Sequence, residues 1–124
     1  MRERGKRGFQ SRVIDCFQAA GAQVLNIEFT PQSGWPDLHV DHVRYHGWVE
    51  LKVRDGSVDA NQRIIARRLE RTGARVCVIR LMHSGGIRLE KHDGTMLVEM
   101  GPEWFDKSNL QWSGVNLLEI LNVD

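Results

Sequence analysis

Two stretches of the chain carry hydrophobic residues at three- and four-residue intervals, the spacing that buries one face of a helix. They predict helices over residues 8–20 and 61–72. A glycine follows each stretch, at Gly21 and Gly73, and Asp59 stands where an N-cap would begin the second helix. Each helix is expected to pack one face against a core and to expose the other.

Between and after these helices the pattern changes to short runs rich in β-branched and aromatic residues, which favour strands. These runs predict strands over residues 23–29, 37–40, 47–53 and 75–81, and a hairpin over 87–98 that turns at Asp93-Gly94. A strand, a helix and a strand in that order imply a parallel pair joined by a right-handed crossover. The remainder is aromatic-rich, with a short helix near 115–121.

Length and composition match a globular protein. The 124 residues suit one domain over 1–124, with a core over about 8–81 and a C-terminal extension over about 82–124. No apolar run reaches the ~20 residues of a membrane span, and the N-terminus lacks the apolar stretch of a signal peptide, so a cytoplasmic location is expected. Cys16 and Cys77 lie in separate apolar segments and are expected to be reduced.

Charge is unevenly distributed although the formal net charge is only +1. Residues 1–12 and 63–91 are basic, whereas 13–62 and 92–124 are acidic. Basic blocks around an acidic centre would suit a protein that grips a phosphate backbone beside a cation-binding cluster. Solvated faces of alternating sign are the simpler interpretation. The candidate nucleic-acid contacts in the first block are Lys6, Arg7 and Arg12.

The candidate chemistry lies on the two central predicted strands. Alternation along a strand sends Glu50 and Lys52 to the same face, while Leu51 points into the core and leaves its backbone carbonyl available as a ligand. Asp37, at the start of the neighbouring strand, can join them. Two carboxylates and a carbonyl suit Mg²⁺ or Mn²⁺. A polar stripe on a half-exposed strand is the alternative.

The second predicted helix adds a glutamine and a row of arginines. Gln62 falls within the buried stripe at the first turn, where its amide needs partners, and the strand of Glu50 and Lys52 is the natural place for them. The arginines recur at four-residue spacing on a separate stripe and are candidate nucleic-acid contacts: Arg63, Arg67 and Arg71. A structural amide and a solvated helix face are the alternatives.

These motifs resemble the PD-(D/E)xK nuclease superfamily, most closely its VRR-NUC branch (virus-type replication-repair nucleases), with the Holliday-junction resolvases as near relatives. The matching segments are Gly34-Trp-Pro-Asp37, Val49-Glu-Leu-Lys52, 56–62 and 73–78. The resemblance implies an α/β fold with a restriction-endonuclease-like αβββαβ core, a central mixed sheet flanked by helices. The predicted C-terminal hairpin and short helix would follow it.

The resemblance also implies roles. Asp37 and Glu50 would be metal ligands, Lys52 the catalytic lysine and Gln62 the helix glutamine near the metal, with Mg²⁺ or Mn²⁺ as cofactor. The family commonly carries a glutamate on the first helix, and this helix has none. Gln10 is the best placed substitute, with Glu28 as a further candidate.

The function expected from these features is a metal-dependent DNA endonuclease acting on branched or otherwise structured DNA in replication, repair or recombination, as a homodimer. A nuclease-fold module that binds nucleic acid without useful catalysis is the alternative, supported by the missing glutamate. Histidines 39, 42 and 46 and the four tryptophans could also contribute to metal or base contacts, although structural use is the simpler interpretation for them.

Overall fold

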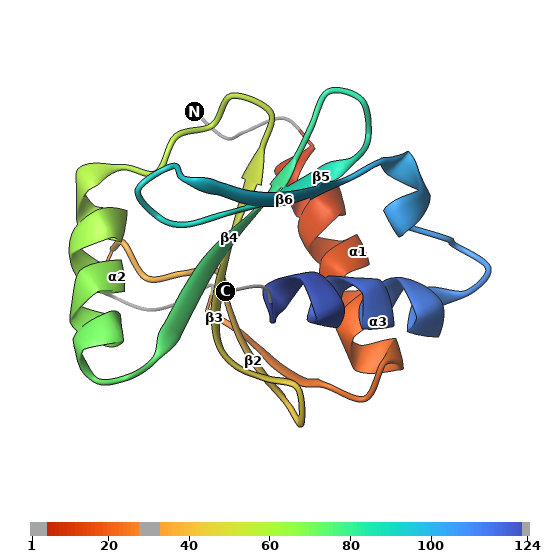
Figure 1. The fold of residues 1–124 in the computed structure, drawn as a ribbon, viewed down its shortest axis with the longest axis horizontal. Helices are drawn as coiled ribbons and strands as arrows, with labels where there is room; N and C mark the ends of the chain where they lie inside the picture. The colour runs from red at the N-terminus through yellow and green to blue at the C-terminus, as the bar shows by residue number, and fades with distance from the viewer. Residues whose placement is uncertain (1–4, 28–32, 123–124) are drawn as a thin grey trace.

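One mixed sheet organises the protein. The computed structural model describes residues 5–27 and 33–122. Its elements are α1 (Lys6–Ala19), β1 (Gln23–Asn26), β2 (Leu38–His42), β3 (Tyr45–Val53), α2 (Ala60–Arg71), β4 (Arg75–Leu81), β5 (Ile87–Glu90), β6 (Met96–Met100), a 3-10 turn at Pro102–Trp104 and α3 (Leu110–Leu121). Helices α1 and α3 lie on one side of the sheet and α2 on the other (Figure 1).

The strands stand in the sheet in the order in which they occur in the chain. Among the six strands that the structure describes, β3 and β4 are parallel and all other neighbours are antiparallel. The parallel pair needs a crossover, and α2 supplies it. The mixed sheet flanked by helices that the sequence predicted is therefore confirmed.

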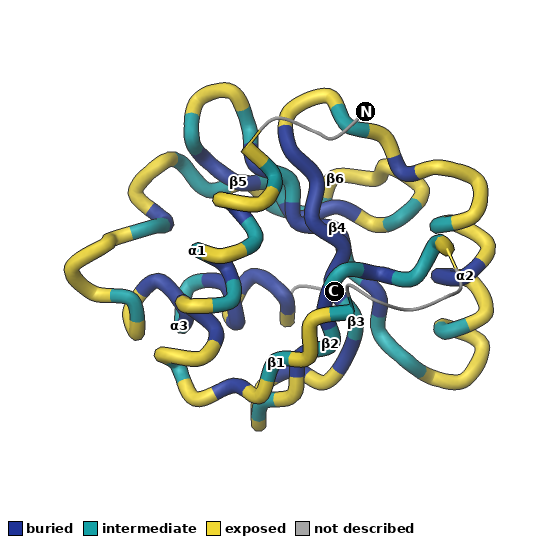
Figure 2. The backbone as a smooth tube through the Cα atoms, turned by 180° about the vertical axis from the view of Figure 1, so that it is seen from behind, coloured by how far each residue is buried: buried dark blue, intermediate teal, exposed yellow. Residues whose placement is uncertain are grey.

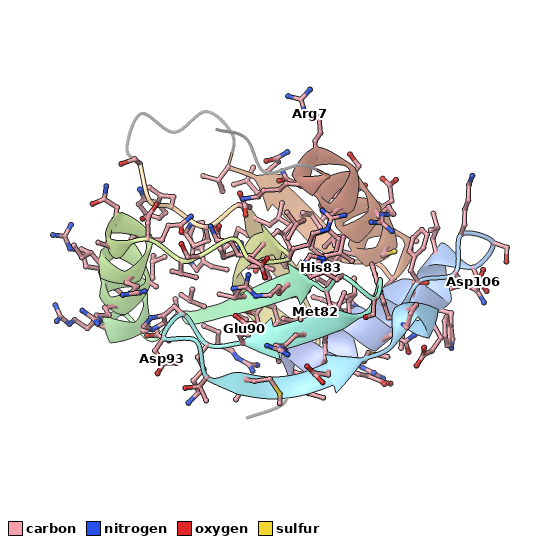
Figure 3. All side chains as sticks on the ribbon, turned by 90° about the horizontal axis from the view of Figure 1, so that it is seen from above. Arg7, Met82, His83, Glu90, Asp93 and Asp106 are labelled. Carbon is pink, nitrogen blue, oxygen red and sulfur yellow. The ribbon has the colours of Figure 1, made fainter. Side chains whose placement is uncertain are left out.

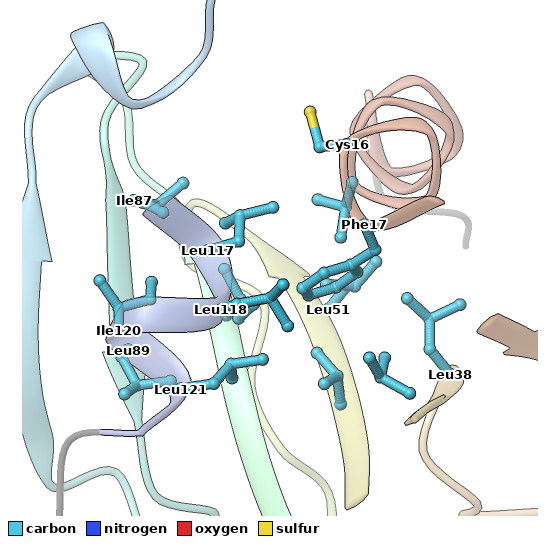
Figure 4. Packing of buried hydrophobic residues seen from close by; sticks show 14 of the residues in the cluster. Cys16, Phe17, Leu38, Leu51, Ile87, Leu89, Leu117, Leu118, Ile120 and Leu121 are labelled. Atoms are coloured by element: carbon cyan, nitrogen blue, oxygen red, sulfur yellow. The ribbon is translucent and has the colours of Figure 1, made fainter. Parts of the chain in front are cut away.

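The main core lies between the sheet and the pair α1 and α3. Phe9, Val13 and Phe17 of α1 are fully buried, as the helical spacing predicted. They belong to one buried cluster with Leu51 and with leucines 117, 118 and 121 of α3; Figure 4 shows the Phe17 side of this cluster. The two helices approach closely at Gly114, where a Cβ atom would collide with the carbonyl oxygen of Cys16. A glycine is required there by the helix contact.

The face of the sheet that carries Glu50 and Lys52 is covered differently. Helix α2 packs its buried Ile65 and Ala66 toward this face, and Val76 and Val78 of β4 are buried on it. The outward side of α2 is exposed, while the central strands are mostly buried (Figure 2). This face therefore holds a small apolar cluster and, beside it, buried charges.

Two predicted helix starts were wrong. α1 begins at Lys6, two residues earlier than predicted, because Gly5 adopts a positive φ of 82° and its carbonyl accepts from Phe9 N. The last helix spans 110–121 rather than 115–121, and Asn109 caps it by accepting from Trp112 N. Gly114 interrupts the helical pattern of α3 in the sequence, but in the structure it allows the close contact with α1.

The strands differ from the prediction by about two residues at three ends: β2 runs on to His42, β3 begins at Tyr45, and β6 ends at Met100. The strand over 75–81 is reproduced in full, and α2 is shifted by one residue. The first strand ends at Asn26, and part of its predicted range, residues 28–29, lies outside the described residues. No helix in the part of the chain that the structure describes is long and apolar enough to cross a membrane.

Candidate active site

Asp37 occupies a break in the pairing of the two central antiparallel strands. Strand β2 pairs with β3 only as far as Leu38 opposite Val49. Beyond that point the Asp37 side chain replaces a strand partner, because Leu51 N donates a 2.8 Å hydrogen bond to Asp37 Oδ2. The N–H and C=O groups of one strand residue point to the same side. The Leu51 carbonyl therefore faces the edge at which Asp37 lies.

Glu50 and Lys52 point to the same face of β3, as alternation predicted. Glu50 is 4% exposed and Lys52 6%, and Lys52 Nζ lies 3.4 Å from Glu50 Oε2. Leu51 between them is fully buried in the main core. An acid and a cation are thus held on a central strand whose backbone is paired with β4 on one side and, at Leu51, held by the Asp37 side chain on the other.

Gln62 links α2 to this pair. Its Oε1 accepts from Asp59 N at 3.0 Å in a capping box, while Gln62 N donates to Asp59 Oδ1 at 2.9 Å. The amide nitrogen donates to Glu50 Oε2 at 2.9 Å. The sequence pointed to this strand as the place for the Gln62 partner, and the amide fills a structural role at the cap and contacts the carboxylate as well.

The contribution of α1 differs from the one expected. Lys6, assigned from sequence to nucleic-acid contacts, places Nζ 3.3 Å from Asp37 Oδ2 and 3.7 Å from Glu50 Oε2. Gln10, the expected glutamate substitute, donates to Asn26 Oδ1 at 3.2 Å. Glu28 lies outside the described residues. The signal for Lys6 was present in the sequence, because it precedes the buried Phe9 by three residues and so continues the buried stripe.

Burial dominates the electrostatics of this cluster. Burial, with a smaller contribution from the neighbouring Asp37, raises the pKa of Glu50 from 4.5 to about 7, although Lys6 and Lys52 act in the opposite direction. The Glu50 carboxylate therefore lacks full compensation and would gain from a further positive charge nearby.

The donor set suits a hard divalent cation. The carboxylates of Asp37 and Glu50 converge on one position. A positive charge already lies there, because the Lys6 ammonium is 3.3 Å from the first carboxylate and 3.7 Å from the second. The Leu51 carbonyl faces the same edge, and oxygen ligands of this kind suit Mg²⁺ or Mn²⁺. Among the described residues no three His, Cys, Asp or Glu side chains are grouped so that they could hold a metal ion. Water and substrate oxygens would have to complete the coordination.

The other candidate nucleic-acid residues lie away from the carboxylates. The α2 arginines at 63, 67 and 71 are exposed on the outer side of the helix. Arg7 projects away from the body of the protein (Figure 3). The guanidinium of Arg12 lies 5.4 Å from the ring centre of Phe105, so it packs on the C-terminal region.

The four tryptophans differ in burial and in the residues that they contact. Trp104 is fully buried in the core, and Trp112 is 45% exposed on α3. Trp35 and Trp48 lie against each other, 5.3 Å between ring centres, two residues from Asp37 and Glu50 respectively. His39 and His46 both pair with Asp41.

Comparison with known proteins bears on the fold. No family model matches the sequence, and no curated protein matches it. The structure is similar to that of Hjc, a Holliday junction resolvase from the hyperthermophilic archaeon Archaeoglobus fulgidus. The TM-score is 0.55 at 16% sequence identity, over 94% of this chain and 99% of that chain. The chain therefore shares the α/β fold of that resolvase, with a mixed sheet flanked by helices.

Proposed function

We propose that this protein is a Mg²⁺- or Mn²⁺-dependent DNA endonuclease that acts on branched or otherwise structured DNA, as a homodimer, in replication, repair or recombination. The observation that carries the proposal is the convergence of Asp37 and Glu50 beside Lys52, at the break between β2 and β3. The fold likeness to a Holliday junction resolvase supports it, as does the motif resemblance to the VRR-NUC branch.

Each residue would have a defined part in the reaction. Asp37, fixed by Leu51 N, and Glu50, fixed by Gln62, would hold the ion together with the Leu51 carbonyl. A bound ion would supply polarisation of the phosphate and a lowered pKa for a water molecule. The Lys52 ammonium, which lies 3.4 Å from Glu50 Oε2, would offset the negative charge that builds on the phosphate.

DNA would be bound by cations outside this cluster. The exposed arginines of α2 form one such surface, with Arg7 and Arg12 of α1 as further candidates. Contacts of this type follow the phosphate backbone and weaken with salt. In this proposal the chain is a single nuclease domain, in which the C-terminal region supports α1 through α3.

Cleavage assays test the proposal. End-labelled duplex, splayed, flap and four-way-junction DNA are incubated with Mg²⁺ or Mn²⁺, using the wild-type chain and the Glu50→Gln and Lys52→Met variants. Metal-dependent cutting should fall by about 100-fold or more in each variant, the size typical of losing one preorganised electrostatic group. Circular dichroism establishes that both variants are folded. Cutting that persists unchanged in Glu50→Gln would refute the assignment.

A second function is a nucleic-acid-binding module without catalysis. It is favoured by one observation, the Lys6 ammonium that lies between Asp37 and Glu50. In that case DNA would be bound but not cut, and Asp37→Asn would leave the binding unchanged with or without Mn²⁺. Fluorescence anisotropy with the same labelled DNA distinguishes this result from that of the nuclease.

A further inference from the structure

We propose that Lys6 belongs to the metal site, as the resident cation of Asp37 and Glu50 in the metal-free protein, and that a divalent ion binds only by displacing its ammonium group. This inference rests on the proposed function, since it concerns the same carboxylates. It assigns to the first helix a cation where the related nucleases commonly carry an acid.

The position of Lys6 is set by the fold rather than by chance contact on a surface. It is the first residue of α1, three residues before Phe9, which is fully buried. Its side chain is 22% exposed and reaches both carboxylates at once. The next residue, Arg7, is exposed and points outward (Figure 3). Adjacent cations on one helix therefore have different surroundings.

The carboxylates need such a cation when no metal is bound. Glu50 is buried, and its charge is disfavoured by burial and by the neighbouring Asp37. Lys52 contacts Glu50, whereas Lys6 contacts Glu50 and Asp37 together. Lys6 is thus the cation that offsets the charge of the Asp37 and Glu50 carboxylates together. Leaving buried charges without it would be unfavourable.

The ammonium and a metal ion compete for one place. A divalent ion bound by Asp37 and Glu50 would sit within a few ångströms of Lys6 Nζ, and like charges at that distance repel strongly. Lysine has a flexible four-carbon stem, so its head group can leave while α1 stays in place. The displaced ammonium remains tethered beside the site, where it can pair with a substrate phosphate.

Metal affinity therefore depends on residue 6 in a defined order. Lys6→Gln removes the competitor and should tighten Mn²⁺ binding about tenfold, the effect of ~1.4 kcal/mol. Lys6→Glu also adds an oxygen ligand and should tighten it further. Lys6→Arg keeps the positive charge and should leave the affinity near that of the wild type. Arg7→Gln is the matched control, because it removes a charge from the same helix turn outside the site.

Calorimetric titration of Mn²⁺ into the EDTA-treated, dialysed chain measures these affinities without DNA. Circular dichroism is recorded for every variant. If the wild type binds Mn²⁺ and Lys6→Gln binds no more tightly, the inference is overturned while the proposed function stands. If neither the wild type nor any Lys6 variant binds Mn²⁺, the proposed metal site fails as well.

Displacement itself has a direct readout. Acetylation of Lys6 by an amine-reactive reagent, followed by mass spectrometry, should become several-fold faster when Mn²⁺ is added, because the ammonium leaves the carboxylates. Lys107, which is exposed, is the internal control and should react at one rate throughout. An unchanged Lys6 rate at saturating Mn²⁺ would overturn the inference even if the affinities followed the expected order.

Discussion

The two faces of the sheet are built on different principles. On the core face, which carries Val49 and Leu51, apolar side chains are covered by α1 and α3. On the site face, which carries Glu50 and Lys52, α2 is the helix that packs against the sheet among the described residues, and charged side chains are buried beside its apolar contact. Side chains of β3 alternate between the two faces, so this one strand contributes to both. The packing of Leu51 in the core fixes the backbone and thereby the orientation of Glu50 and Lys52 on the other face.

Further charged residues lie on the site face in the neighbouring strands β4 and β5. Arg80 of β4 forms a two-pronged contact with Glu90 of β5, at 2.8 and 3.1 Å. Glu90 is 4% exposed. Buried charges stabilise little by themselves but become costly when one partner is lost. The core face therefore supplies stability through apolar burial, whereas the site face is stable only while each buried charge keeps its partner.

The largest expected effect is on the core face. Trp104→Ala removes a fully buried ring that contacts Phe9 and Phe105. It should lower the free energy of unfolding by about 3–5 kcal/mol, as such truncations do in other cores. Urea unfolding followed by circular dichroism measures the change. Trp112→Ala, at a half-exposed position, is the control and should cost less than about 1 kcal/mol; equal losses would contradict the assignment of Trp104 to the core.

The next effect is on the site face. Arg80→Met leaves Glu90 buried without its two-pronged partner and should lower the free energy of unfolding by about 3 kcal/mol. The double variant Arg80→Met with Glu90→Leu should recover much of the loss in free energy of unfolding, because this pair then leaves no unpaired buried charge. Arg44→Met removes an exposed pair with Glu119 on the surface, away from Glu90, and should cost about 1 kcal/mol or less. No recovery in the double variant would argue against pairing as the cause.

The smallest expected effect is a pH dependence. Burial raises the pKa of Glu50 to about 7 from 4.5, so the folded, metal-free protein holds this proton more tightly than the unfolded chain. Stability from this group is full below about pH 4.5 and is lost as the pH rises to about 7. Glu50→Gln cannot titrate, so its stability should change less than that of the wild type over this range.

Urea midpoints at pH 4.5, 6 and 8 in EDTA measure this difference between wild type and variant. Other titrating groups are common to both proteins and cancel in the comparison. If the urea midpoints of the two proteins change with pH in parallel, Glu50 keeps an ordinary pKa. The charge of Glu50 would then be fully compensated in the metal-free protein, contrary to the description of the site face given above.

Much of the fold could be predicted because it depends on local patterns. The strand over 75–81 and the cap at Asp59 follow from residue type and spacing alone. The missed start of α3 shows the limit of such patterns. Gly114 weakens the local helix signal, yet it is needed where α3 crosses α1 at Cys16, and no local rule reveals that crossing.

The candidate site divides in the same way. The sequence determined that Glu50 and Lys52 share one face of a strand, because alternation is a property of the backbone, and it indicated Gln62 as their neighbour through the helical stripe. Two contacts became visible in the folded protein alone: Asp37 accepts from Leu51 N, and Lys6, instead of Gln10, reaches the carboxylates. Both contacts depend on where β2 stops pairing and how α1 docks on the sheet, which are set by long-range packing.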